Sequence, residues 1–176
     1  QVLNQVQFKY CLMDTMNLWI ETQREELYKA IKLISGLIIN ENEAFLLTQE
    51  PNYLKAGEKL LQQGLPFVII KRGDSGVSFF SKQGDFYSFP AYPVKDLTDP
   101  TGAGDSFAGG FTSYLANIYQ KGQDPLKHIK EALIYAVTVA SFYVEGFGIE
   151  GLAQKTKKDI DSRLKNFIEF SSFPNF

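Results

Sequence analysis

The sequence predicts an α/β fold, a three-layer α/β/α sandwich around a mostly parallel sheet. Short apolar runs of strand length alternate with amphipathic helical stretches, and glycines end several of these segments. The 176 residues are 44% hydrophobic, which is enough to bury a core. Alternating strands and helices favour right-handed crossovers, which place helices on both faces of a parallel sheet. We therefore expect a single domain over residues 1–176.

The first half of the chain carries this alternation. An apolar run at residues 8–13 predicts a strand, and residues 23–35 predict a helix with its apolar side chains on one face. Gly36 ends that helix, and residues 37–39 predict a short buried strand that stops at Asn40. A second helix is expected at residues 53–63 and a second buried strand at residues 66–71.

The second half begins with a different pattern. Residues 76–80 and 85–89 predict two paired strands joined by a turn. Helices are expected at residues 106–119, 125–144 and 157–170. No internal repeat, low-complexity tract or interdomain linker is evident.

Charge and cysteine content exclude some classes of protein. Eighteen basic and twenty acidic residues nearly balance, so the sequence does not predict nucleic-acid binding. No apolar run reaches the roughly 18 residues of a membrane span, and no leader pattern opens the sequence. Cys11 is the only cysteine, and a chain without an internal disulfide fits a reducing compartment. We expect a cytoplasmic protein with a small-molecule substrate.

The most informative stretch, residues 99–110, reads Asp-Pro-Thr-Gly-Ala-Gly-Asp-Ser-Phe-Ala-Gly-Gly. A Gly-Ala-Gly turn that leads into a helix leaves backbone N–H groups free to bind an anion, and the helix dipole adds to the attraction. Asp105 would repel a phosphate there, unless it serves as the base that takes a proton from an attacking hydroxyl. The alternative is a plain glycine turn with Asp105 as a helix cap. Gly109 and Gly110 would allow close packing against the sheet.

This stretch resembles the C-terminal signature of the PfkB carbohydrate kinase family, which includes ribokinase, fructokinases and adenosine kinase. The resemblance implies a ribokinase-like sandwich and transfer of the γ-phosphoryl of ATP to a hydroxyl of a sugar or nucleoside. It assigns Asp105 as the general base. It also assigns Gly102, Ala103 and Gly104 to the hole that stabilises charge on the transferring phosphoryl group.

A second motif follows the strand that ends at Asn40. Asn40 and Glu43 match the family's Asn-x-x-Glu pattern, which helps to hold Mg²⁺ and its waters near the ATP phosphates. Mg²⁺ prefers oxygen ligands and keeps several waters, so these residue types suit it. The alternative is that the two residues cap a helix, because a capping box has the same spacing.

The strand at residues 66–71 ends in Lys71, and Gly73 follows it. Family members place a strand-end residue and a glycine here against the nucleotide phosphates. Lys71 would reach a phosphate as a point charge, and Gly73 would let the backbone come close. The alternative is a charged surface turn, and we expect Arg72 to be solvated or structural.

The resemblance also suggests contacts on either side of the glycine turn. Thr101, with Asp99 before it, and Gly146, with Gly148 after it, lie where many members have an adenine pocket and a monovalent-cation site for an ion such as K⁺. Residues 14–20 resemble a segment common in the family's sugar kinases, to which we assign no role.

The resemblance covers only the C-terminal, ATP-binding and catalytic part of the family's kinase domain. The N-terminal half, with the lid and most acceptor-binding residues, has no counterpart. Two hypotheses therefore remain: an ATP-dependent kinase, or a truncated, non-catalytic nucleotide-binding or interaction domain that retains the fold. The intact Asp105, Glu43 and glycine turn favour the kinase. A sheet without its other half would expose an edge, so we expect a homo-oligomer joined through residues 8–13.

Overall fold

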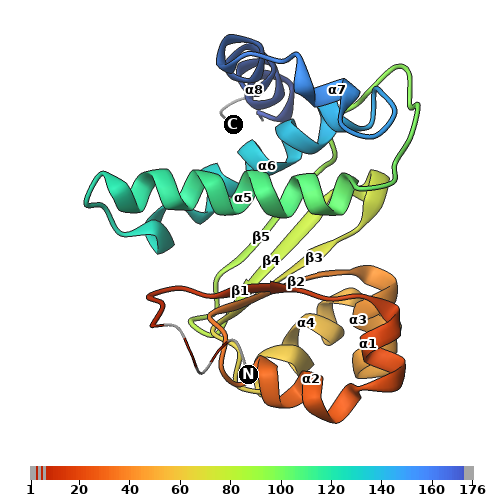
Figure 1. The fold of residues 1–176 in the computed structure, drawn as a ribbon, viewed down its shortest axis with the longest axis vertical. Helices are drawn as coiled ribbons and strands as arrows, with labels where there is room; N and C mark the ends of the chain where they lie inside the picture. The colour runs from red at the N-terminus through yellow and green to blue at the C-terminus, as the bar shows by residue number, and fades with distance from the viewer. Residues whose placement is uncertain (1–2, 4, 6, 173–176) are drawn as a thin grey trace. The chain divides into compact units, whose positions relative to one another are not determined.

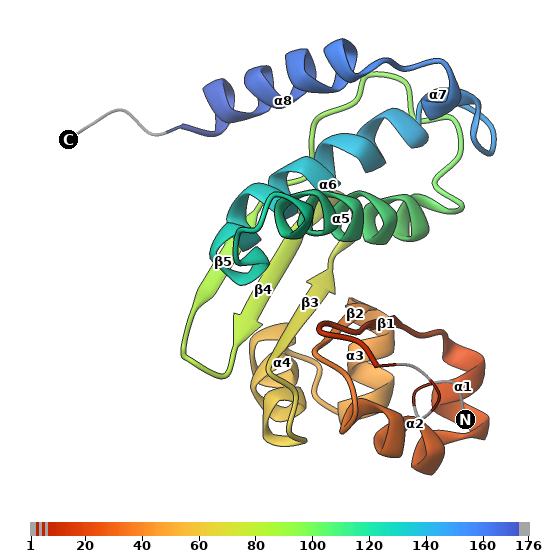
Figure 2. The ribbon, with the colours of Figure 1, turned by 60° about the vertical axis from the view of Figure 1, so that its left-hand side comes forward.

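The computed structural model describes residues 3, 5 and 7–172, which form two compact units. Unit 1 consists of Gln1–Gly73 and Val77–Ser88, and unit 2 of Asp74–Gly76 and Phe89–Phe176. Figures 1 and 2 show the helices and strands of both units.

Unit 1 is built on a five-stranded sheet with the order β1-β2-β3-β4-β5. The strands are β1 (Leu12–Asp14), β2 (Gly36–Asn40), β3 (Phe67–Lys71), β4 (Val77–Ser81) and β5 (Phe86–Phe89). The first three run parallel, and β4 pairs with β3 in the antiparallel direction. The expected mostly parallel sheet is confirmed, and so is the strand pair at its end.

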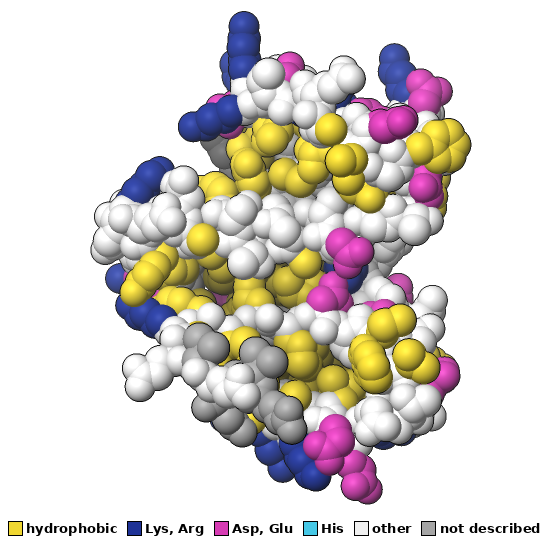
Figure 3. All heavy atoms as spheres, viewed as in Figure 1, with side chains coloured by type: hydrophobic (Ala, Val, Ile, Leu, Met, Phe, Trp, Pro, Cys, Tyr) yellow, Lys and Arg dark blue, Asp and Glu magenta, His cyan; other side chains and the backbone are white. Residues whose placement is uncertain are grey.

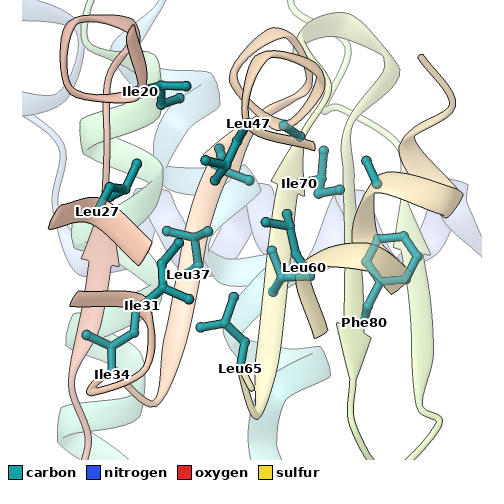
Figure 4. Close-up of a cluster of buried hydrophobic side chains, with 14 residues drawn as sticks. Ile20, Leu27, Ile31, Ile34, Leu37, Leu47, Leu60, Leu65, Ile70 and Phe80 are labelled. Atoms are coloured by element: carbon teal, nitrogen blue, oxygen red, sulfur yellow. The ribbon is translucent and has the colours of Figure 1, made fainter. Parts of the chain in front are cut away.

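Four helices cover one face of this sheet, as both ribbon views show. They are α1 (Asn17–Thr22), α2 (Arg24–Ile31), α3 (Glu41–Thr48) and α4 (Tyr53–Gln62). Side chains alternate between the two faces of a strand, so every second residue points toward the helices. Figure 4 shows the resulting core, whose strand members are Leu37, Ile39, Val68, Ile70 and Phe80.

The sequence misplaced some boundaries in unit 1. Strand β1 begins at Leu12, so the expectation of a strand from residue 8 was wrong for residues 8–11. The main chain of Cys11 forms hydrogen bonds instead with Ser35 and with Gly36, the first residue of β2, at 2.8–3.2 Å. Helix α2 ends at Ile31 rather than at residue 35. Helices α1 and α3 were missed, because six and eight residues are too few for a clear periodic pattern.

Unit 2 is helical in its regular structure. Its helices are α5 (Ala103–Gln120), α6 (Ile129–Tyr143), α7 (Glu150–Ala153) and α8 (Lys157–Ser171), with the 3-10 turn η3 (Pro125–His128) before α6. Gly110 lets α5 and α6 approach closely, since a Cβ there would lie 3.2 Å from the Cα of Ala136. Gly110 therefore serves helix–helix packing, while a Cβ at Gly109 would meet no atom within 4 Å.

Arg163 ties α8 to the end of α6. Its Nη2 donates to both carboxylate oxygens of Glu145, at 3.1 and 2.9 Å, and its Nη1 donates to Ser141 Oγ at 3.1 Å. The guanidinium also lies over the ring of Phe142, 3.5 Å from the centroid, and over that of Tyr92, at 4.9 Å. Only 16% of the Arg163 side chain and 28% of the Glu145 side chain are exposed, so solvent screens the pair weakly.

We expect Arg163→Met to lower the free energy of unfolding by about 2 kcal/mol, because it leaves a half-buried carboxylate without its partner. Urea unfolding of the chain would measure the change. Lys165→Met on the same helix is the matched control. Its 3.9 Å contact with Glu169 is largely exposed, and we expect a change below about 0.5 kcal/mol. Equal effects of the two substitutions would contradict the role given to Arg163.

No helix within residues 7–172 is long and apolar enough to cross a bilayer.

Candidate functional site

Four side chains gather at one edge of the sheet in unit 1. Strands β1, β2 and β3 are parallel and in register, so their carboxyl ends reach the same edge, where open α/β sheets bind ligands. Asp14 ends β1, Asn40 ends β2, Lys71 ends β3, and Glu43 lies in the first turn of α3. We call these four residues the edge cluster.

Asn40 and Glu43 form a capping box at the start of α3. The Asn40 Oδ1 accepts a hydrogen bond from the Glu43 N–H at 2.8 Å, and the Glu43 Oε2 accepts one from the Asn40 N–H at 2.9 Å. Asn40 and Glu43 therefore do cap helix α3, which was the alternative that their spacing left open. The cap engages the Glu43 Oε2 and the Asn40 Oδ1.

Glu43 is only 7% exposed. Burial raises the pKa of its carboxyl group above the ordinary value. The hydrogen bond from the Asn40 N–H and the positive charge of Lys71 lower that pKa in part, whereas the negative charge of Asp14 raises it. Asp14 and Lys71 are therefore both within electrostatic reach of Glu43.

Lys71 is held by an ion pair. Its Nζ lies 2.8 Å from the Asp14 Oδ2, and the two side chains are 17% and 28% exposed. The structure thus places Lys71 at the predicted sheet edge but gives it a carboxylate partner that the sequence did not suggest. Asp14 also accepts a hydrogen bond from the Thr15 N–H at 2.8 Å, through Oδ1.

The edge cluster suits a metal ion that keeps most of its waters. Its donors are carboxylate and amide oxygens, which Mg²⁺ prefers. No three His, Cys, Asp or Glu side chains within the described part of the chain are placed to enclose a metal ion. This set of donors fits contacts made through water better than a fully protein-ligated ion.

Gly73 begins the 3-10 turn η2 (Gly73–Ser75) just beyond Lys71, with a φ of 57°. A Cβ at Gly73 would meet no atom within 4 Å, so its backbone faces open space. Arg72 lies over the ring of Tyr53, 4.5 Å from its centroid, and donates to Ser88 Oγ at 3.2 Å. These contacts give Arg72 the structural role expected for it.

In unit 2 the glycine turn forms the N-terminus of α5. Gly102 is the N-cap residue in the left-handed conformation, with a φ of 86°, and its carbonyl accepts from the Ser106 N–H at 2.9 Å. The Ala103 N–H donates to the Pro100 carbonyl at 3.1 Å. The N–H groups of Gly104 and Asp105 find no acceptor in the described part of the chain. These two free amides can bind an anion at the positive end of the helix dipole.

Asp105 is the third residue of α5, and its side chain is exposed. Its carboxylate forms no hydrogen bond or ion pair with the described residues, and no side chain caps this helix. Asp105 is therefore not a helix cap, which was the alternative to a catalytic role. Helix α5 begins at Ala103, three residues before the expected start at residue 106, so residues 103–105 belong to its first turn.

The segment before the turn is fixed by the loop that follows α6. The N–H groups of Thr98 and Asp99 donate to the Val144 carbonyl at 2.9 and 3.3 Å. The Asp99 carboxylate accepts from the Thr101 N–H at 2.9 Å. Hydrogen bonds from Thr101, and then one from the Gly148 N–H, lower the pKa of Asp99. The structure thus brings together Asp99, Thr101 and Gly148, three residues of the expected cation and adenine neighbourhoods.

Gly146 and Gly102 are both needed for close packing. A Cβ on Gly146 would lie 2.5 Å from the Gly151 nitrogen. One on Gly102 would lie 2.6 Å from the Tyr143 Oη. For Gly146 the structure thus gives a packing reason, and its suggested contact with a nucleotide stays a prediction.

Sequence reasoning missed two features of these sites. Asp14 was seen only as part of a family-like segment, although its place at the end of a strand was a usable signal. The second feature is a set of exposed apolar side chains beside the Asp99 and Gly148 segments, namely Leu97, Phe147 and Ile149, which are 62–70% exposed. No periodicity marks these three residues, because they lie outside the long helices.

Comparison with known proteins identifies the family and the fold. The model of the pfkB family carbohydrate kinases matches residues 2–155. A cytidine kinase from Thermococcus kodakarensis is 37% identical over 91 residues, which are 51% of this chain and 32% of that protein. A mouse (Mus musculus) ribokinase is 33% identical over 138 residues, covering 75% of this chain and 40% of that protein.

Solved structures share the fold. The structure of Arabidopsis thaliana ribokinase complexed with ribose and ATP matches with a TM-score of 0.66 and 26% identity, over 78% of this chain and 43% of that one. The chain therefore spans less than half the length of these relatives. The expected ribokinase-like α/β fold is confirmed, and the chain belongs to the pfkB family of carbohydrate kinases.

Proposed function

We propose that this chain carries the ATP-binding and catalytic part of a kinase that moves the γ-phosphoryl of ATP to a hydroxyl of a sugar or nucleoside. One observation carries the proposal. The exposed Asp105 carboxylate forms no hydrogen bond or ion pair with the described residues. It lies beside two free backbone amides at the start of an 18-residue helix. The helix dipole favours an acidic side chain in the first turn, but this carboxylate caps no N–H group of the helix, whereas phosphoryl transfer needs a base at that place.

In this mechanism Asp105 takes the proton from the acceptor hydroxyl as its oxygen forms a bond to the γ-phosphorus. The bond from that phosphorus to the bridging oxygen breaks, and ADP leaves with the electron pair. The free amides of the 102–105 turn, with Gly102 shaping its backbone, would stabilise the charge on the phosphoryl oxygens. Ala103 contributes through its small size, because its N–H is already bonded.

The other candidate residues would hold the nucleotide and its metal. Lys71, and Gly73 with its open backbone, are assigned to the nucleotide phosphates, and Thr101 and Gly146 are assigned to nucleotide binding. Asn40 and Glu43 would hold Mg²⁺ through its waters, and the bound ion would neutralise phosphate charge. A monovalent cation such as K⁺ is proposed for the neighbourhood of Asp99.

The names of the relatives support the class of acceptor. One relative is a cytidine kinase and others are ribokinases, one of them solved with ribose and ATP. A sugar or nucleoside hydroxyl is therefore the acceptor to test first. ADP release should be followed with a panel of pentoses, hexoses and nucleosides. We expect release with some members of the panel and none without an acceptor, and no release with any of them would contradict the proposal.

Glu43→Gln should raise the Mg²⁺ concentration needed for nucleotide binding about tenfold, because the amide keeps the shape but loses the charge that attracts the ion. Titration of Mg²⁺ at fixed ADP, followed by calorimetry, would measure this shift. Glu58→Gln on the exposed face of α4 is the control and should leave the titration unchanged. Identical curves for Glu43→Gln and wild type would reject the metal role.

The alternative function is a non-catalytic nucleotide-binding or interaction domain. An exposed apolar group on unit 1 favours it: Met16, Leu18 and Trp19 are each about half exposed, and Figure 3 shows hydrophobic side chains over the part of unit 1 that carries α1. These residues adjoin β1, whose outer edge has no partner strand among the described residues. The homo-oligomer expected from the sequence stays a prediction, which light scattering would check.

A further inference from the structure

The ion pair between Asp14 and Lys71 reaches across a whole strand. Strand β2 lies between β1 and β3, and neighbouring strands are about 4.8 Å apart, so β1 and β3 are about 9.6 Å apart. Asp14 pairs with Ile38 and Lys71 with Asn40, so the two residues are also offset by two positions along the strands. The long Lys71 side chain bridges this gap, and its Nζ lies 2.8 Å from the Asp14 Oδ2. The pair therefore crosses the last residues of β2, from the level of Ile38 to that of Asn40, close to Glu43.

The pair decides which charge this edge presents. Asp14, Glu43 and Lys71 carry two negative charges and one positive charge when all three are ionised. The ammonium that the proposed function assigns to phosphate is already bound to a carboxylate, with both side chains largely shielded from water. Asp14 is thus a second negative group for an incoming phosphate to meet, and a competitor for the same lysine.

A metal-free nucleotide and a metal-bound one meet this edge differently. Phosphates alone would bring several negative charges to a region that is already negative, and they would have to displace Asp14 from Lys71. A divalent cation bound to the phosphates would offset the negative charge of both carboxylates. Displacing Asp14 from Lys71 would then cost less free energy. Like charges a few ångströms apart in a partly buried site interact strongly enough to change binding measurably.

We infer that Asp14 is a specificity-determining residue, which makes the site select the Mg²⁺-bound nucleotide over the free nucleotide by neutralising Lys71. The inference rests on the proposed function, because it assumes that the nucleotide phosphates bind at this edge. It assigns Asp14 a task distinct from that of Glu43. Glu43 attracts the ion, whereas Asp14 penalises a nucleotide that arrives without it.

Calorimetry with ADP, once in EDTA and once in saturating Mg²⁺, tests the inference without any need for turnover. For the wild type we expect tighter binding in Mg²⁺. Asp14→Asn should tighten binding in EDTA and reduce the ratio of the two dissociation constants about tenfold, the size expected when one partly screened charge is removed. Asp14→Ser is a second variant in case the amide disturbs the strand end. Glu58→Gln is the control with an exposed carboxylate removed.

The possible outcomes distinguish failure of this inference from failure of the proposed function. If the wild type binds ADP in neither condition, the proposed function fails and the inference with it. If the wild type prefers Mg²⁺ and both Asp14 variants keep the same ratio, the inference is overturned while the function stands. An equal loss of affinity in both conditions would also overturn it, because Asp14 would then only support the fold. Lys71→Gln should weaken ADP binding in both conditions.

Discussion

Asp105→Asn is expected to abolish phosphoryl transfer while ADP still binds. The amide has the shape of the carboxylate but cannot take the proton of the acceptor hydroxyl. Removal of a general base typically costs about 10²–10⁴-fold in rate. The Asp105 carboxylate forms no hydrogen bond or ion pair with the described residues, so its replacement should leave the fold intact.

Steady-state kinetics with the best acceptor, together with ADP calorimetry, would measure both sides of this prediction. Affinity for ADP should stay the same or rise, because a negative charge beside the anion-binding amides is removed. Asp124→Asn would be a poor control, since the Asp124 side chain caps η3. Glu58→Gln, on an exposed helix face of unit 1, is the better one. Near-normal turnover by Asp105→Asn would remove Asp105 from the catalytic role.

Gly102→Ala is expected to have the second large effect. The φ of 86° at Gly102 is a left-handed conformation that costs other residues about 1–2 kcal/mol. The added Cβ would also lie 2.6 Å from the Tyr143 Oη, so the ring or the turn must move. We expect a loss of about 3 kcal/mol in the free energy of unfolding and at least tenfold weaker ADP binding.

Gly109→Ala is a matched control on the same helix. A Cβ at Gly109 would meet no atom within 4 Å, and alanine favours a helix interior, so we expect a gain of about 0.5–1 kcal/mol. Urea unfolding of both variants would make the comparison. If Gly102→Ala is as stable as Gly109→Ala and binds ADP normally, the turn does not need glycine and its assignment to the phosphate site is wrong.

The sequence was a good guide where the local pattern was strong. The strands at Leu37–Ile39 and at residues 66–71 were recognisable because their apolar runs are short, buried and bounded by glycine or polar residues. The helix expected at residues 53–63 matches α4 within one residue, because its apolar side chains repeat at helical spacing. The position of the glycine turn and Asp105 at a helix start is confirmed, because the local motif alone indicates it.

What the sequence could not give depends on contacts between distant residues. Asp14, the partner of Lys71, is 57 residues away in the sequence, and no local pattern around either residue predicts the ion pair. Asn40 and Glu43 had two possible roles on spacing alone, and only the hydrogen bonds reveal that the capping box is formed. Gly110 was expected to pack against the sheet, whereas in the structure it packs against Ala136 of α6. This contact depends on how two helices pack together, which a local pattern does not reveal.

The fate of the γ-phosphorus tests the central claim most directly. Phosphorus NMR of the chain with ATP, Mg²⁺ and the best acceptor of the panel would follow it in one experiment. The account predicts that the γ signal of ATP disappears as one phosphomonoester signal and ADP grow in equal amounts, and that Asp105→Asn produces neither. An unchanged ATP spectrum with every acceptor, or inorganic phosphate as the product in place of the ester, would contradict the account.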